Sequence, residues 1–200
     1  MISIGLTGNI GSGKSIVARI FSALAVPVYH ADLESKRLLE EDEVKALIRS
    51  ELGDRFFTQA GTIDRKTLAS LVFSDANSLA KLNHILHSRV MADFDQWSSR
   101  HKDTPYIILE AAILFETGYN KKMYRTIVVS CPPEIAIRRV VLRDQVTRED
   151  ILMRMKFQWT DEEKVRSADF VIRNDGDTML IPQVIETDRQ LRILAMAKKI

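Results

Sequence analysis

The chain carries near its amino end the stretch Gly8-Asn9-Ile10-Gly11-Ser12-Gly13-Lys14-Ser15, in which four residues separate the first Gly from Gly-Lys-Ser. The apolar run of residues 1–7 predicts a buried strand before it, and apolar residues at helical spacing predict a helix over residues 16–24 after it. A strand, a glycine-rich turn and the start of a helix, in this order, form the context in which the pattern indicates a phosphate-binding loop. We therefore expect this segment to hold the phosphates of a nucleotide.

Each residue type in the phosphate-binding loop has a physical role. Glycine lacks a Cβ, so the backbone can take positive φ and close around a ligand with successive N–H groups pointing inward. Lys14 reaches the β and γ phosphates, the Ser15 hydroxyl suits Mg²⁺, and the N–H of Ile16 in the first helical turn is expected to be free for phosphate. The residues expected to bind nucleotide are Gly8, Gly11, Ser12, Gly13, Lys14, Ser15 and Ile16. A glycine-rich turn without a ligand is the alternative, which the flanking strand and helix disfavour.

Length and composition indicate one soluble globular domain over residues 1–200. Hydrophobic residues make up 46% and charged residues 28% of the sequence, as is usual for such a domain. The net charge of +2 is too weak to predict a nucleic-acid or membrane partner. The single cysteine, Cys131, excludes an intrachain disulfide and fits a reducing compartment. Because no apolar run approaches about 20 residues and the first strand begins at residue 2, we expect no membrane span, no signal peptide and a cytoplasmic location.

Four further apolar segments predict strands, at residues 26–30, 106–110, 125–130 and 169–173. They are apolar on both faces and alternate with helical patterns, which indicates a parallel sheet covered on both sides. A closing helix is expected over residues 179–200. The predicted fold is α/β, a five-stranded parallel sheet with helices on both faces.

A long helical stretch separates the second and third predicted strands, at about residues 32–102. Its apolar residues repeat at helical spacing: Leu68, Leu71, Val72, Leu79, Leu82, Ile85, Leu86, Val90 and Phe94. Since it is too long for a plain crossover, we expect an inserted subdomain over the carboxyl edge of the sheet, where ligands bind in such folds.

A second helical segment, at about residues 138–160, is rich in arginine. Arg139 and Arg143 share one helix face at a spacing of four residues, and a further helix carries Arg154. Thr147 with Asp150 between the two helices resembles a capping box. We expect this pair of helices to form a lid whose arginines stabilise charge on a transferred phosphoryl group. Solvated helix faces or structural ion pairs are the alternative.

Several titratable side chains are expected to follow strands at the ligand-binding edge. Asp32 follows the second strand, where a carboxylate either accepts a proton from an attacking hydroxyl or caps the helix that begins at residue 33; spacing alone leaves both open. Glu110 follows the third strand and is a candidate to hold Mg²⁺ indirectly. His84 and His87 lie one helical turn apart without further ligands at zinc spacing, so a packed or substrate-contacting histidine is expected there.

These residues together resemble the dephospho-coenzyme A kinase family over nearly the full length of the chain. The matching segments are residues 6–15, Ala31-Asp32, Ile85-Leu86-His87, Ile113-Leu114-Phe115-Glu116, Arg143-Asp144 with Arg154 and Gln158, and Ala168-Asp169-Phe170-Val171-Ile172 with Asn174. The family often has Asp where this chain has His30, and Thr where it has Ile16. Only the first segment is a general motif, so the ordered set is what indicates this family.

The resemblance implies transfer of the ATP γ-phosphoryl group to the ribose 3′-hydroxyl of dephospho-coenzyme A, with Mg²⁺ held by Ser15. It implies that Asp32 is the catalytic base, with Lys14 and Arg143 acting on the phosphoryl group. The inserted subdomain would bind the coenzyme A side, with substrate contacts from His87 and Arg154. Nucleotide contacts would come from Arg139 and Asn174.

Two other classes of protein share a phosphate-binding loop. Another small-molecule kinase would have the loop and lid but a different insertion. A regulatory GTPase would have a guanine-reading Asn-Lys-x-Asp, and Asn120-Lys121-Lys122-Met123 fails at its last position. A nucleic-acid-dependent ATPase would have an aromatic and basic surface for single strands, which the sequence lacks.

Overall fold

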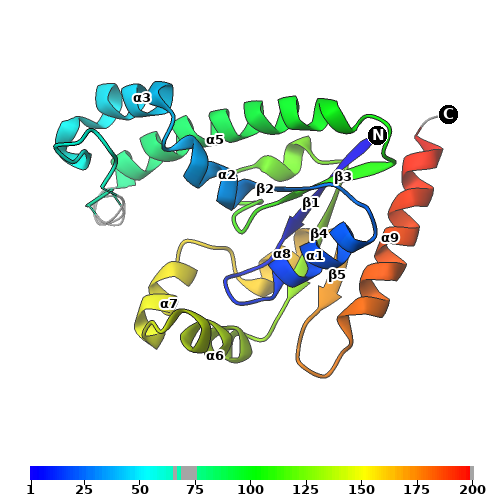
Figure 1. Ribbon diagram of the computed structural model, residues 1–200. Helices are drawn as coiled ribbons and strands as arrows, with labels where there is room; N and C mark the ends of the chain where they lie inside the picture. Colours follow the sequence, from blue (N-terminus) through cyan, green and yellow to red (C-terminus); the bar gives the residue numbers. More distant parts are fainter. Residues whose placement is uncertain (65–66, 69–75, 199–200) are drawn as a thin grey trace. The chain divides into compact units, whose positions relative to one another are not determined.

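The computed structural model describes residues 1–64, 67–68 and 76–198 of the chain (Figure 1). The contacts divide it into two compact units, one of Met1–His30 with Ser98–Ile200 and the other of Ala31–Trp97. The insertion expected at about residues 32–102 therefore overlaps the second unit, although residues 98–102 belong to the first. Leu71 and Val72 of the expected apolar pattern lie outside the described residues.

The first unit is built on a sheet of five parallel strands in the order β2-β3-β1-β4-β5, which confirms the predicted fold class. The strands are β1 (Ile2–Thr7), β2 (Val28–His30), β3 (Tyr106–Glu110), β4 (Arg125–Ser130) and β5 (Phe170–Arg173). β2 begins at Val28, two residues later than predicted. Pro27 lacks an N–H and can only accept in the ladder, through its carbonyl to the Ile108 N–H at 2.9 Å.

Helices that connect or follow these strands cover the sheet. They are α1 (Lys14–Ala23), α6 (Pro133–Asp144), α7 (Arg148–Met155), α8 (Asp161–Ser167) and α9 (Leu180–Ala197), with 3-10 turns η2 (Ser99–His101) and η3 (Tyr119–Lys122). One core cluster joins α1 and α9 to the sheet, with Ile4, Phe21 and Leu191 fully buried. Each such side chain stabilises the fold by about 1.5–3 kcal/mol relative to exposure.

The closing helix α9 is also tied to the sheet by a partly buried polar contact. The hydroxyl of Tyr106, at the start of β3, donates to Asp188 Oδ1 at 2.6 Å. Arg192 donates to the same carboxylate and, through Nη2, to the carbonyl oxygen of Leu24 at 3.1 Å. Burial and the hydrogen bond to Asp188 raise the pKa of Tyr106, so the hydroxyl stays protonated and donates. These bonds join the start of β3 and the end of α1 to the interior turns of α9.

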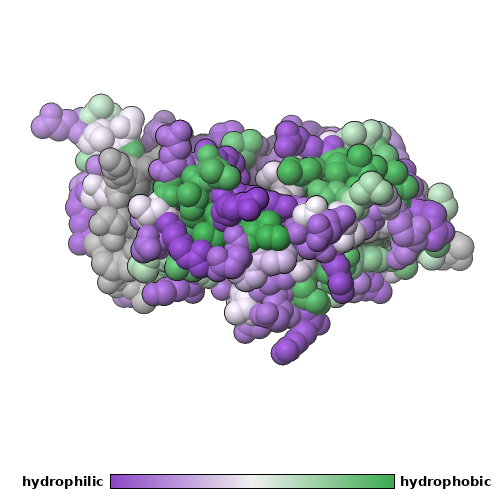
Figure 2. Space-filling view, turned by 90° about the horizontal axis from the view of Figure 1, so that it is seen from below, coloured by the Kyte–Doolittle hydropathy of each residue, from purple (hydrophilic) through white to green (hydrophobic). Residues whose placement is uncertain are grey.

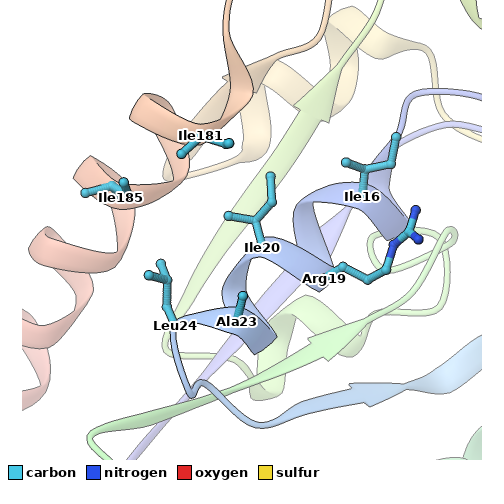
Figure 3. A pocket seen from close by; sticks show the side chains of 7 residues that line it. All are labelled: Ile16, Arg19, Ile20, Ala23, Leu24, Ile181 and Ile185. Atoms are coloured by element: carbon cyan, nitrogen blue, oxygen red, sulfur yellow. The ribbon is translucent and has the colours of Figure 1, made fainter.

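An apolar groove of about 460 Å³ remains between α1 and α9. Its lining comprises Ile16, Arg19, Ile20, Ala23 and Leu24 from α1 with Ile181 and Ile185 from α9 (Figure 3). Ile16, Ile181 and Ile185 are exposed. Figure 2 shows hydrophobic side chains gathered in patches among hydrophilic ones on one face of the molecule. None of the helices in the described part of the chain has the length and apolarity that crossing a membrane requires.

The two helices predicted to form a lid, α6 and α7, pack on each other through their own small core. Ile137 and Val140 of α6 and Ile151 of α7 are buried together, and Ile10 of the phosphate-binding loop packs against them. The predicted capping box is confirmed: the Asp150 N–H donates to Thr147 Oγ1 at 3.2 Å, and the Thr147 N–H donates to Asp150 Oδ2 at 3.1 Å. The turn between the helices is therefore fixed locally.

The second unit is mainly helical in its described part, with an isolated antiparallel bridge between Phe57 and Ile63. It contains α2 (Ala31–Leu38), α3 (Asp42–Leu52), η1 (Asp54–Phe56) and α5 (Ala76–Ser98), the last of which ends one residue beyond the unit. Its core includes Val44, Ile48, Phe56, Leu82 and Ile85. Arg37 of α2 pairs with Glu34, Glu41 and Asp93, and the last of these ties α2 to α5. The unit thus has its own apolar core and its own ion pairs.

Candidate active site

The phosphate-binding loop is shaped by glycines that no other residue could replace without displacing neighbours. Gly11 has φ 79° and Gly13 has φ 91°, values that side chains with a Cβ rarely adopt. A Cβ on Gly11 would lie 2.3 Å from the carbonyl oxygen of Ala136, and one on Gly13 would lie 2.1 Å from Asn174 Nδ2. The loop is therefore packed closely between α6 and the residue that follows β5.

Asn174 braces the loop from the end of β5. Its side-chain Nδ2 donates to the carbonyl oxygen of Ser12 at 2.7 Å, and the residue is buried. Arg139 of α6 donates to Asn174 Oδ1 at 3.4 Å and to the Asn174 carbonyl oxygen at 3.3 Å. Arg139 thus contacts Asn174, and Asn174 contacts the loop.

Lys14 is held by a buried carboxylate at the end of β3. Glu110 is 4% exposed, and its Oε1 accepts a hydrogen bond from Lys14 Nζ. Its Oε2 lies 2.5 Å from Nδ1 of His30, the last residue of β2. Burial by itself would raise the pKa of Glu110, but the hydrogen bond to His30 and the charge of Lys14 outweigh it, so the net effect is to lower the pKa. Glu110 is therefore an ionised partner for the lysine at neutral pH.

Buried polar atoms in the loop indicate that it is built for a polar ligand. Asn9 Oδ1 and Ser12 Oγ are buried without a hydrogen-bond partner among the described residues. An unsatisfied buried hydroxyl costs about 1–3 kcal/mol, so the Ser12 hydroxyl is a donor that a phosphate oxygen would satisfy. With the N-terminus of α1 beside it, the loop has the chemistry of an anion site.

One sequence expectation about the loop is wrong. The N–H of Ile16 was expected to be free for phosphate, but it donates to the carbonyl oxygen of Gly13 at 2.9 Å. The first turn of α1 closes with this shorter hydrogen bond, while the N–H of Val17 donates to the same oxygen at 3.2 Å. The side chain of Ile16 lines the groove between α1 and α9. A phosphate could bind the Ile16 N–H only by sharing it with the carbonyl oxygen of Gly13.

A Mg²⁺ ion would depend on few protein atoms here. No cluster of three or more His, Cys, Asp or Glu side chains suited to a metal ion occurs among the described residues. Mg²⁺ in phosphate-transfer sites is usually held by one or two protein oxygens together with phosphate oxygens and water. The Ser15 hydroxyl, in the first turn of α1, is an oxygen ligand of the required hard type.

The lid arginines differ in what they contact. Arg143 Nε donates to Asp144 Oδ1 at 2.7 Å and its Nη2 to Oδ2 at 2.9 Å, and its side chain is 66% exposed. The hydrogen bond to Asp144 raises the pKa of Arg143, which is charged in any case. Arg154, in the last turn of α7, is exposed. Of the three lid arginines expected at the site, Arg139 is the one joined to the loop, through Asn174.

A hollow of about 620 Å³ opens beside Arg139, at the base of the lid. Its lining residues are Glu134, Ile135, Arg138, Arg139, Arg148, Asp175, Gly176 and Asp177. At its rim Arg148 of α7 donates twice to the carboxylate of Glu134 on α6, at 2.7 and 2.6 Å. The hollow lies next to Asn174 in sequence and in space, so it adjoins the loop through the Arg139 contact.

Two expected site residues lie in the second unit. Asp32 is in the first turn of α2, which begins at Ala31. The alternative in which Asp32 caps a helix beginning at residue 33 is therefore wrong, since the residue is already helical. His87 lies on α5, where burial and nearby His84 lower its pKa, so its imidazole is neutral at pH 7.

Comparison with known proteins identifies the family. A family model described as dephospho-CoA kinase matches residues 2–179. The chain belongs to the dephospho-CoA kinase family. The dephospho-CoA kinase of Bacteroides fragilis is 42% identical over 189 residues, which is 92% of this chain and 90% of that protein. The dephospho-CoA kinase of Thermus thermophilus is 38% identical over 180 residues, 88% of this chain and 84% of that protein.

A solved structure shows the same fold. The crystal structure of TT1252 from Thermus thermophilus superimposes with a TM-score of 0.83 at 34% sequence identity, covering 94% of this chain and 96% of that one. The likeness therefore extends over nearly all of both chains, beyond the phosphate-binding loop.

The sequence pattern did not indicate one buried charge in this chain. Lys164 of α8 is fully buried, with Nζ 2.7 Å from the carbonyl oxygen of Ala112 and 3.1 Å from Glu116 Oε1. Burial lowers the pKa of Lys164, although the charge of Glu116 opposes this. Charged residues on short helices are usually solvated, so nothing in the local sequence singled this lysine out.

Proposed function

We propose that the chain transfers the γ-phosphoryl group of ATP to the ribose 3′-hydroxyl of dephospho-coenzyme A, giving coenzyme A and ADP. The observation that carries this is the family match over residues 2–179, combined with an intact phosphate-binding loop. Membership in the dephospho-CoA kinase family indicates that the acceptor is dephospho-coenzyme A. The loop indicates where the donor, ATP, binds.

The donor end of the site is assigned to the first unit. Backbone N–H groups of the loop and the N-terminus of α1 bind the β and γ phosphates, and Lys14 exchanges part of its contact with Glu110 for phosphate oxygens. Ser15 would hold Mg²⁺, which would neutralise charge on the phosphate oxygens of the donor. We assign the adenosine of ATP to the hollow beside Arg139, because it adjoins the loop and carries polar groups from Arg138 and Asp175.

The acceptor end is assigned to Asp32. Its carboxylate accepts the proton of the 3′-hydroxyl as that oxygen bonds to the γ phosphorus, and the bond between the γ phosphorus and the β–γ bridging oxygen breaks. The leaving group is ADP. His87 and Arg154 are assigned to the substrate, and a neutral imidazole at His87 suits hydrogen bonding better than charge pairing.

The lid supplies positive charge during the transfer. Negative charge develops on the oxygens of the moving phosphoryl group and its neighbours, and an arginine placed there stabilises the transition state more than the ground state. We assign this role to Arg143, whose pairing with exposed Asp144 is a surface contact of small free energy. Exchange of the Arg143 contact with Asp144 for a contact with phosphate therefore costs little.

A cytoplasmic location fits a pathway that supplies both ATP and dephospho-coenzyme A to this chain.

The test is direct turnover. The purified full chain, with ATP, Mg²⁺ and dephospho-coenzyme A, should give coenzyme A and ADP in equal amounts, measured by chromatography. A Lys14→Ala variant is the control, since it removes the charge that reaches the phosphates. Wild-type turnover of another alcohol without turnover of dephospho-coenzyme A would assign the chain to a different small-molecule kinase. Strong stimulation of ATP hydrolysis by nucleic acid would favour a nucleic-acid-dependent ATPase.

A further inference from the structure

The backbone of the phosphate-binding loop has an unusual partner at its third residue. The N–H of Ile10 donates to the side-chain Oε1 of Gln158 at 3.0 Å, across 148 positions of sequence. A backbone N–H can only donate, so the oxygen of the amide must face Ile10, and this fixes the orientation of the Gln158 side chain. The Nε2 on the other side faces the carbonyl oxygen of Ala112 at 3.5 Å.

We infer that Gln158 is a positioning residue for phosphoryl transfer, because its amide fixes the backbone of the phosphate-binding loop at Ile10. The inference rests on the proposed kinase function and assigns a new role at the same site. Gln158 does not touch the reacting atoms; it determines which N–H groups of the loop are left to face the phosphates. Electrostatic stabilisation of a transition state needs such donors to be oriented before the reaction.

Ile10 is held on its side chain as well as on its backbone. The side chain packs against the lid core of Ile137, Val140 and Ile151. On the next residue, a Cβ added to Gly11 would lie 2.8 Å from Val140 Cγ2. The Gln158 bond therefore acts on a residue that already joins the loop to the lid.

Gln158 is itself fixed at the end of the lid. Its N–H donates to the carbonyl oxygen of Met155, the last residue of α7, at 3.0 Å. Arg154 precedes Met155, so the turn that holds Gln158 is continuous with a lid arginine. A shift of α7 would move the amide, and the amide would move the loop. Gln158 thereby couples the position of the lid to the shape of the phosphate site.

A buried charge fixes the other side of the Gln158 amide. The carbonyl oxygen of Ala112 accepts from Lys164 Nζ at 2.7 Å as well as facing Gln158 Nε2. Lys164 also contacts Glu116, whose Oε1 accepts from the N–H of Trp159 at 2.7 Å. The segment after β3 and the segment after α7 are thus joined on both sides of Gln158.

An aromatic stack completes this junction. The ring of Trp159 lies 5.4 Å from that of Phe115, at an interplanar angle of 7°. Such a pair contributes about 0.5–1.5 kcal/mol beyond its buried area. Because these other contacts hold the chain at this point, removal of the Gln158 amide alone should leave the fold intact and change only the loop.

Two variants separate positioning from stability. Gln158→Met keeps the length and volume of the side chain but loses both hydrogen bonds. Gln158→Glu keeps an acceptor for the Ile10 N–H and adds a negative charge near the phosphates. We expect the Met variant to lower kcat about tenfold or more with a change in Tm of a few degrees at most. We expect the Glu variant to keep kcat within about threefold and to raise the KM for ATP.

The control is Gln190→Met on α9, where the glutamine donates to Glu186 on the surface. Wild-type kcat in the Met variant, or an equal loss in the Met and Glu variants, would overturn the inference. Amide hydrogen exchange at Ile10 is a second measurement that needs no acceptor substrate. Exchange should be at least about fivefold faster in Gln158→Met, and unchanged exchange would also overturn the inference. This measurement stands even if the wild-type chain fails to phosphorylate dephospho-coenzyme A, an outcome that would count against the proposed function alone.

Discussion

The side-chain Nδ2 of Asn174 donates to the carbonyl oxygen of Ser12 at 2.7 Å, which joins the end of β5 to the phosphate-binding loop. The contact is buried and spans 162 positions of sequence. A Cβ on Gly13 would clash with the Asn174 side chain, so this contact can form only because residue 13 is a glycine. The loop is shaped both by its own glycines and by a residue that is distant from it in the sequence.

We predict that Asn174→Ala weakens both the fold and nucleotide binding. The Ser12 carbonyl would lose a buried donor, which costs about 1–3 kcal/mol and corresponds to a fall in Tm of about 2–10 °C for a chain of this size. The KM for ATP should rise, since the loop and Arg139 lose a common support. Thermal unfolding and steady-state kinetics measure the two effects. Asn120→Ala, on η3, is the matched control, and equal effects in both variants would contradict a specific brace.

The pairing of Glu110 with Lys14 and His30 predicts a pH-dependent contribution to stability. Because the pKa of Glu110 in the folded chain lies below its ordinary value, the ionised carboxylate stabilises the fold above the unfolded pKa. This contribution is lost as pH falls through the lower, folded pKa. The free energy of unfolding of Glu110→Gln should therefore differ most from wild type at about pH 7 and least at about pH 3. Urea denaturation at both pH values measures the difference.

The control for this prediction is Glu162→Gln, an exposed residue in the first turn of α8. It should change stability little at either pH. A Glu110→Gln effect that is the same at both pH values would mean that the side chain contributes through packing, because packing does not depend on ionisation.

The sheet and the phosphate-binding loop could be predicted because the sequence patterns that specify them are local. An apolar run, three glycines and a helical repeat each lie within about ten residues, and the period of the pattern decides between strand and helix. The lid turn was predictable for the same reason, since Thr147 and Asp150 are three residues apart. The start of β2 was predicted too early because Val26 is apolar and so fits a strand. The hydropathy pattern does not take into account that Pro27 has no N–H to donate to the sheet.

The contacts that hold the site together were not predictable in this way. Glu110 is 96 positions from Lys14, and Gln158 is 148 positions from Ile10. Such pairs depend on which strand ends become neighbours, and composition does not encode that. The family resemblance named Gln158 but gave it no role. Lys164 was overlooked because a lysine between Glu163 and Val165 has the pattern of a solvated helix face.

The chemistry assigned to Asp32 predicts a separation of binding from transfer. Asp32→Asn keeps the size of the side chain and removes its capacity to accept a proton at neutral pH. We expect kcat to fall by about 10²–10⁴-fold while the affinity for ATP, measured by calorimetry, stays within about threefold. Asp42→Asn, at the start of α3, is the control, since it too places a carboxylate in a first helical turn of the second unit. Near-normal turnover in Asp32→Asn would show that the carboxylate is not the catalytic base and interacts only with the dipole of the helix.

Arg143 offers the sharpest test of the lid. Its guanidinium is paired with Asp144 on the surface, so its loss should leave the fold nearly unchanged and act on the transition state. We expect Arg143→Ala to lower kcat about tenfold or more while the KM for ATP changes less. Arg189→Ala is the matched control, because Arg189 is equally exposed and donates twice to Glu186. An unchanged kcat in Arg143→Ala would transfer the role of stabilising the phosphoryl group to another cation, and Arg154→Ala measured in the same assay would show whether that cation lies on α7.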